Sequence, residues 1–92
     1  MEILFTKHSR KRMQQRGITE NAIKYLIEYG ELKFDGHGGK VYYLNKRKRN
    51  LIPSCLTKNQ FNEIREQLNS FVVLSHRDEV ITVGHRYKRR KN

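Results

Sequence analysis

The spacing of the apolar residues changes at Gly30, and this change decides which class of fold the chain can adopt. Residues 7–16 contain no Gly, Pro or β-branched residue, which predicts a helix that ends at Gly17. Thr19 is a suitable cap for a second helix, which Gly30 closes. Its apolar residues recur at helical spacing and form one stripe for burial: Ala22, Ile23, Leu26 and Ile27. The very short turn between the two helices predicts an αα-hairpin.

Beyond residue 30 the pattern is that of strands. Two strand-like segments, 32–36 and 39–45, flank a Gly-rich tip and predict a β-hairpin. The basic residues 46–50 predict a second turn. This turn leads into a short strand-like segment, Leu51 and Ile52, which Pro53 stops.

The remaining residues predict one more helix and one more hairpin. Thr57 caps a third helix over residues 58–69, whose apolar face is Phe61, Ile64 and Leu68. The strand-like segments 71–75 and 79–87 are joined by a turn at 76–78. We therefore expect an α+β fold, in which an N-terminal αα-hairpin packs on a mainly antiparallel sheet of four or five strands. The third helix is an addition before the last two strands.

The composition says more about the binding partners of the chain than about its fold. The 92 residues suit a single domain over residues 1–92, with a frayed basic tail at 88–92. Lys and Arg number 20 against 9 Asp and Glu, so the net charge is +11, which favours nucleic acid or an acidic protein as partner. No run of about eighteen apolar residues exists, so we expect no membrane span. Cys55 has no partner for a disulfide or a CxxC zinc site, and we expect a reducing, cytoplasmic setting.

The first predicted helix carries a row of possible anion ligands. His8, Arg12 and Arg16 follow one another at a spacing of four residues and so share one helix face. Further cations surround this row: Lys7, Arg10 and Lys11. Like charges at this spacing destabilise a helix by a few tenths of a kcal/mol per pair, roughly, and an anion bound against them would relieve this cost. The alternative is a cationic face that is simply solvated.

A second imidazole, His85, lies in the last predicted strand. Strict alternation places Ile81, Val83, His85 and Tyr87 on one face, and Thr82, Gly84 and Arg86 on the other. His85 then continues an apolar row, where it is either a structural, hydrogen-bonded histidine or a titratable group at the rim of the core. Gly84 leaves room for a ligand or a helix to approach. His37 and His76 are weaker candidates.

The four histidines do not form a metal motif. None of them pairs as HxH, HxxxH or HExxH, and the acidic residues are scattered, so we expect no metal and no other cofactor.

Two further basic runs and several aromatic residues are also candidates for contact with a nucleic acid. The runs at 46–49 and 88–91 suit loops that contact phosphate, or solvated segments. If about six such side chains met phosphates, affinity would fall with roughly the fifth power of the salt concentration. Three phenylalanines are expected in the core: Phe5, Phe61 and Phe71. Alternation turns either Tyr42 or Tyr43 away from the core, where it could stack on a base.

Two blocks of the sequence resemble a known family. The string F-T-K-H-S-R-K-R-M-Q-Q-R-G-I, with its H-x-x-x-R-x-x-x-R-G-I spacing, is similar to the opening of the small bacterial domain-of-unknown-function family 4258. The closing E-V-I-T-V-G-H-R-Y-K-R-R resembles the last strand of that family, although Gly84 and His85 stand where many relatives carry an aromatic and then a basic residue. The blocks cover about half of the chain; residues 45–56 do not match clearly.

The resemblance implies a fold like that of RelE-like and barnase-like ribonucleases, and a toxin of a toxin–antitoxin pair that cleaves RNA without a metal. It implies that His8, Arg12 and Arg16 belong to an active face, which His85, Arg86 and Tyr87 meet from the last strand. Such cleavage needs a base, an acid and fixed cations. We assign the proton transfers to the two histidines in either order, since an imidazole titrates near neutral pH. Arg12 and Arg16 would hold the phosphate bidentately, and Tyr87 would orient a histidine or the phosphate.

Three functions remain open from the sequence. They are a ribonuclease toxin acting on RNA, including mRNA on the ribosome, with an acidic antitoxin; a nucleic-acid-binding module without catalysis; and an adaptor that docks an acidic protein. The residues expected to contact RNA are Lys7, Arg10, Lys11, Lys46, Arg47, Lys48, Arg49, Arg86, Lys88 and Arg89.

Overall fold

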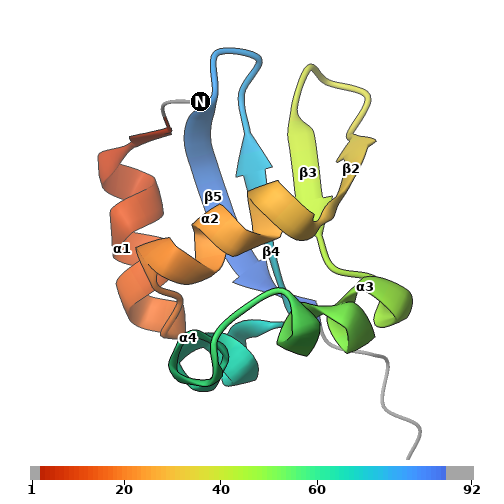
Figure 1. The fold of residues 1–92 in the computed structure, drawn as a ribbon. Coiled ribbons are helices and arrows are strands. Elements are labelled where there is room, and N and C mark those ends of the chain that lie inside the picture. Colours follow the sequence, from red (N-terminus) through yellow and green to blue (C-terminus); the bar gives the residue numbers. More distant parts are fainter. Residues whose placement is uncertain (1–2, 87–92) are drawn as a thin grey trace, which may run out of the picture.

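A computed structural model describes residues 3–86 of the chain as one five-stranded sheet with helices on one face and at one end (Figure 1). The N-terminal elements are β1 (Leu4–Phe5), α1 (Lys7–Arg16) and α2 (Glu20–Tyr29). The hairpin strands β2 (Glu31–Phe34) and β3 (Lys40–Tyr43) follow. Next come α3 (Lys46–Leu51), the 3-10 turn η1 (Ile52–Ser54), α4 (Lys58–Ile64) and the 3-10 turn η2 (Arg65–Gln67). The last elements are β4 (Ser70–Leu74) and β5 (Glu79–His85).

The sheet is mixed, with the strand order β1-β5-β4-β3-β2. The pairs β2–β3, β3–β4 and β4–β5 are antiparallel, whereas the short β1 pairs with β5 in parallel, Leu4 opposite Glu79. The predicted α+β class is therefore confirmed, and β1 is a strand that the predicted element order did not contain.

The first two helices have the predicted bounds, because both have strong local caps. The Thr6 hydroxyl accepts the backbone N–H of Ser9 at 3.1 Å and donates to the carbonyl of Val80 on β5 at 2.9 Å. Thr19 caps α2 by accepting the N–H of Ala22. Gly17 ends α1 in the left-handed region, at φ 66°, as expected for a glycine at this position.

Each of these helices packs on its own part of the sheet. Helix α1 runs beside β5, whereas α2 crosses the same face over β4 and β3 (Figure 1). Residues from both helices and from the sheet form the buried core: Met13, Ile18, Ala22, Ile23, Leu26, Leu44, Ile52, Ile64, Val72, Leu74, Val80 and Val83. Burying one such aliphatic side chain contributes about 1.5–3 kcal/mol.

The segment between β3 and α4 differs from the prediction. Residues 46–50 are not a turn but belong to α3, because the Asn45 side chain caps this helix by accepting the N–H of Lys48 at 2.8 Å. Leu51 and Ile52 are not a strand, since Leu51 ends α3 and the buried Ile52 begins η1. The helix predicted over 58–69 ends at Ile64 and continues only as the single turn η2.

A β-bulge in β5 makes the predicted face of Ile81 wrong. Val73 pairs with Thr82 but Leu74 pairs with Val80, so Ile81 is an extra residue and the alternation changes phase there. Val80 and Val83 both face the core, whereas Ile81 is 43% exposed. His85 lies two residues beyond Val83 and therefore keeps its predicted place on the helix-covered face.

Candidate functional site

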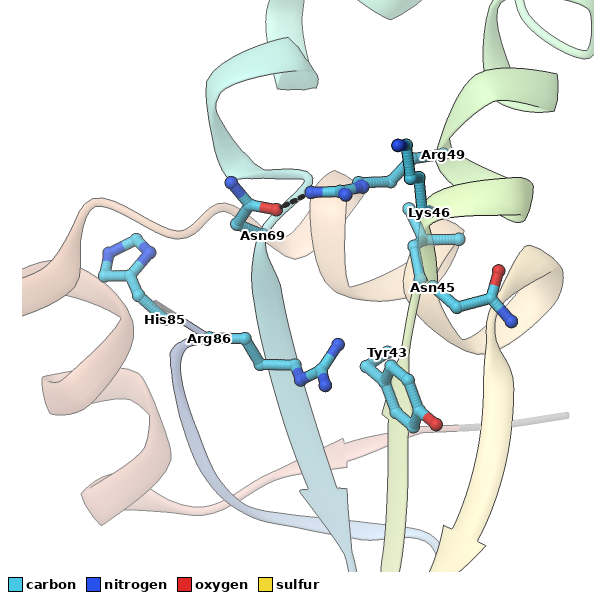
Figure 2. A pocket seen from close by; sticks show the side chains of 8 residues that line it. Tyr43, Asn45, Lys46, Arg49, Asn69, His85 and Arg86 are labelled. Carbon is cyan, nitrogen blue, oxygen red and sulfur yellow. Dashed lines mark hydrogen bonds between the residues drawn. The ribbon is translucent and has the colours of Figure 1, made fainter. Parts of the chain in front are cut away.

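A cleft of about 510 Å³ opens at the edge of the sheet where β3 ends, β4 begins and β5 ends (Figure 2). It is lined by Tyr43, Leu44, Asn45, Lys46, Arg49, Asn69, His85 and Arg86. These lining residues include three Lys or Arg side chains and no carboxylate. We call this site the basic cleft. Its polarity and size suit an anionic group of about the size of a nucleotide.

Two of its guanidinium groups are held in place by neighbours. Arg49 donates from Nη1 to the side-chain oxygen of Asn69 (Figure 2). The guanidinium of Arg86 lies over the ring of Tyr43, 4.1 Å from its centroid, in a cation–π contact. Asn69 also accepts the backbone N–H of Arg86 with its carbonyl, which ties the end of β5 to the start of β4. Both cations are therefore preorganised at the wall of the cleft.

Because the basic run 46–49 lies in helix α3, its side chains point in different directions. Lys46 and Arg49 are three residues apart, so they share the helix face that lines the cleft. Lys48 points elsewhere, with its ammonium 3.4 Å from the carbonyl of Gly30, and Arg47 is exposed outside the cleft lining. Only half of the run thus contributes to this site.

His85 stands at the rim of the basic cleft and is held by two contacts. Its Nε2 lies 2.8 Å from the carbonyl oxygen of Arg16, the last residue of α1. A carbonyl only accepts, so this Nε2 carries the hydrogen and Nδ1 is the basic nitrogen of the neutral ring. Nδ1 lies 3.4 Å from the hydroxyl of Ser70, which is fully buried. The structure therefore fixes both the tautomer and the orientation of this imidazole.

The predicted row on α1 shares one face, as its spacing requires. Arg12 donates from Nε to Nε2 of His8, at 3.4 Å. Arg16 lies at the other end of the helix, where it lines a second hollow of about 660 Å³ together with Glu63, Glu66 and His85; His85 thus borders both this hollow and the basic cleft. Two carboxylates make this hollow a poorer place for a phosphate than the basic cleft.

The two histidines proposed for proton transfer are not brought together. His85 contacts the last residue of α1, whereas His8 lies in the first turn, eight residues earlier. Eight helical residues span about 12 Å along the axis. His8 is also exposed and does not line the basic cleft.

The other cations expected to contact RNA lie apart from the cleft or are already paired. Lys7 and Lys11 are exposed on α1. Arg10 forms an ion pair with Glu20, at 2.9 Å, and its guanidinium lies 4.9 Å from the centroid of the Phe5 ring. Three predicted site residues lie outside the described part of the chain: Tyr87, Lys88 and Arg89.

Gly84 has a structural use that the sequence did not predict. A Cβ at this position would lie 2.8 Å from two carbon atoms of the Phe71 ring. The space beside Gly84 is thus filled by Phe71 rather than open to a helix. Phe71, paired with Gly84 and Tyr43, lies on the sheet face opposite to the core residue Val72, so its predicted place in the core is wrong.

Two asparagines of the cleft were not predicted. Asn45 had a readable signal, because an Asn that precedes a run without Gly or β-branched residues is a helix cap. Asn69 had none, since its contacts with Arg49 and Arg86 depend on residues far away in the sequence.

Within residues 3–86 no three His, Cys, Asp or Glu side chains gather as a metal site would require. In the same part of the chain no helix has the length and apolar character needed to cross a membrane.

Residues 5–91 match the model of a family described as a domain of unknown function (DUF4258), and the chain belongs to this family. No curated protein and no solved structure matches the chain. The resemblance inferred from the first and last blocks of the sequence is thereby confirmed at the level of the family.

Proposed function

We propose that this protein binds RNA and holds a phosphate of the strand in the basic cleft. The observation that carries this proposal is the convergence of Lys46, Arg49 and Arg86 on one cleft whose lining contains no carboxylate. Arg49 and Arg86 are held by Asn69 and Tyr43, so little side-chain entropy is lost when an anion binds. The net charge of +11 adds long-range attraction for a polyanion.

The simplest test is binding of a fluorescent RNA strand, measured by anisotropy at several salt concentrations. We expect binding that weakens steeply as salt rises, and that weakens further when Arg49 is changed to Gln. Arg77→Gln is the matched control, because Arg77 is exposed in the turn between β4 and β5 and does not line the cleft. Absence of binding at low salt, or an equal loss in both variants, would contradict the proposal.

A second function, cleavage of the bound strand, is favoured by the orientation of His85. An imidazole whose Nε2 donates to a fixed carbonyl has its tautomer set, with Nδ1 as the nitrogen that can accept a proton. The Ser70 hydroxyl would turn away from Nδ1, which would then take the proton of a 2′-hydroxyl while the 2′-oxygen attacks the adjacent phosphorus. The bond from phosphorus to the 5′-oxygen breaks, and that oxygen takes a proton from water; the hydroxide left behind removes the proton from His85, so the imidazole returns to its neutral form. The products are a 2′,3′-cyclic phosphate and a 5′-hydroxyl.

In this scheme the cations of the cleft stabilise the charge on the phosphate. Arg86 and Arg49 replace Arg12 and Arg16 in that role, because they line a cleft beside His85 that has no carboxylate, whereas the hollow that Arg16 shares with His85 also contains Glu63 and Glu66. For the role in the cell, we propose what the resemblance implies: the protein is an RNA-cleaving toxin that is paired with an acidic antitoxin in the cytoplasm.

The cleavage proposal is tested by incubating RNA with wild-type protein, His85→Gln and His8→Gln in EDTA, and mapping the ends of the products. We expect 2′,3′-cyclic phosphate ends from the wild type and from His8→Gln, and no cleavage by His85→Gln. If only His8→Gln lost cleavage, the active site would lie on α1 and not in the basic cleft. An RNA-binding wild type that cleaves neither purified RNA nor mRNA in a translating extract would leave only the binding function.

A further inference from the structure

The helix-free face of the sheet carries a row of aromatic residues that leads to the basic cleft. Tyr43 on β3 is opposite Phe71 on β4, and Phe71 is opposite Gly84 on β5. Helices α1 and α2 cover the other face (Figure 1). Tyr43 also lines the basic cleft, so the row and the cleft are continuous.

Phe71 lies against the backbone of its neighbouring strand. The missing side chain of Gly84 leaves space that the ring occupies, since a Cβ there would be 2.8 Å from two of the ring carbons. Phe71 is only half-buried, although its neighbours on either side in β4, Ser70 and Val72, are completely buried. A large aromatic side chain is thus kept partly exposed beside a cationic cleft.

Arg86 supplies a second flat surface. One side of its guanidinium lies on the ring of Tyr43, at 4.1 Å, and the residue as a whole is exposed (Figure 2). A guanidinium plane stacks on nucleobases as aromatic rings do. Lys33 of β2 also reaches over Tyr43, at 5.6 Å from the centroid, so cations border the aromatic row.

The charge on this face suits a nucleic acid strand. Arg86 lines the cleft together with Lys46 and Arg49, and Lys33 lies over the ring of Tyr43, which lines the cleft too. The same region also contains a carboxylate, that of Glu31. This carboxylate is already engaged, because it accepts a hydrogen bond from the Asn45 amide at 2.8 Å. Aromatic surface next to phosphate-binding cations is the arrangement by which proteins hold single strands, whose bases are unpaired and can stack.

We propose that Phe71 and the Arg86–Tyr43 stack form a base-stacking surface, and that the ligand is therefore single-stranded RNA, with its bases on the helix-free face and its phosphates in the basic cleft. This inference rests on the proposed RNA binding and deepens it. Duplex RNA fits this surface poorly, because its bases are stacked on one another. The competing explanation is that Phe71 only fills the space above Gly84.

The test compares two strands that carry the same phosphates. One is an oligoadenylate of about eight nucleotides, and the other is an abasic strand of equal length. We expect wild-type protein to bind the oligoadenylate about tenfold more tightly at one salt concentration. Phe71→Leu should lower that affinity to near the abasic value and leave abasic binding unchanged, whereas Phe71→Tyr should keep the preference.

A spectroscopic readout separates stacking from an indirect effect on the fold. A 2-aminopurine base placed in the strand should lose fluorescence on binding wild-type protein, and lose less on binding Phe71→Leu. Equal wild-type affinity for the two strands would overturn the inference while leaving RNA binding intact, and this comparison holds even if Phe71→Leu does not fold. Binding of neither strand at low salt would overturn the proposed function, and the inference with it.

Discussion

The imidazole of His85 joins the end of the last strand to the end of the first helix, with its Nε2 2.8 Å from the carbonyl oxygen of Arg16. This carbonyl is one of the terminal acceptors of α1 that have no partner within the helix. The other ring nitrogen lies 3.4 Å from the buried hydroxyl of Ser70. One side chain thus positions a helix, a strand and the rim of the basic cleft.

Replacing His85 should destabilise the fold as well as alter the site. In His85→Leu the hydroxyl of Ser70 stays buried without its partner, and leaving a buried polar group unsatisfied costs about 1–3 kcal/mol. Urea denaturation measures this loss. Adding Ser70→Ala to His85→Leu should recover part of it, and a double variant no more stable than His85→Leu would contradict this account.

Gly84→Ala should destabilise the protein although alanine is otherwise acceptable in a strand. The added Cβ would lie 2.8 Å from the ring of Phe71, and overpacking of this kind costs about 1–3 kcal/mol. The thermal midpoints of the single variants and of Gly84→Ala/Phe71→Leu form a double-mutant cycle. We expect Gly84→Ala to lower the thermal midpoint much less when Phe71 is already Leu. If the effects of the two substitutions on the thermal midpoint simply add, the two residues do not interact.

Thr6→Ala should weaken the link between α1 and β5. The Thr6 hydroxyl caps α1 at Ser9 and also donates to the carbonyl of Val80. Loss of a cap costs about 1 kcal/mol, and the unpartnered carbonyl adds to this loss. Chemical denaturation should find Thr6→Ser close to wild type, because serine keeps the hydroxyl. Equal instability of the serine variant would instead assign the effect to the lost methyl group.

The salt dependence of RNA binding should count the phosphate contacts in the cleft. For single strands each contact contributes about 0.7 to the slope of log affinity against log salt. Lys46→Gln and Arg49→Gln should each lower the slope by about this amount, while the exposed turn residue Arg77, changed to Gln, should not alter it. Slopes that fall equally in all three variants would mean that net charge, and not the cleft, determines binding.

The hairpin between β2 and β3 should lose stability in acid. The carboxylate of Asp35 accepts the backbone N–H of His37 at 2.7 Å and of Gly39 at 2.9 Å. These bonds lower the pKa of Asp35 from its ordinary value of 3.8. The folded pKa is below the unfolded one, so the stabilisation is present above pH 3.8 and is lost as pH falls through the folded pKa. The stability gap between wild type and Asp35→Ala should therefore narrow below pH 3.8, and a gap that stays constant would contradict this.

Local signals predicted the two N-terminal helices well. The predicted cap Thr19 and the predicted terminator Gly17 act through hydrogen bonds to residues three or four positions away, and so does Thr6, a cap that was not predicted. Helix α3 was missed because its sequence looks like a charged loop, although Asn45 caps it and Ile52 anchors its end in the core.

Features that depend on two distant strands could not be predicted. The bulge at Ile81 exists only relative to β4, where the consecutive residues Val73 and Leu74 pair with Thr82 and Val80, the two residues on either side of Ile81. The basic cleft likewise joins residues 43–49, 69 and 85–86, which are brought together by the strand order. Sequence spacing predicted that His8 and Arg12 share a face, but not that His85 lies at the opposite end of their helix.

The pairing of the first strand with the last also governs when this protein can fold during its synthesis. Helix α1 packs on β5, and Thr6 is bonded to Val80, 74 residues later. Contacts this distant in the chain form slowly and need both partners present. On the ribosome, α1 must therefore wait, with Met13 uncovered, until residues 79–85 have been made. A nascent chain arrested before that point keeps the core residue Met13 exposed, and exposed core residues are what chaperones and proteases recognise.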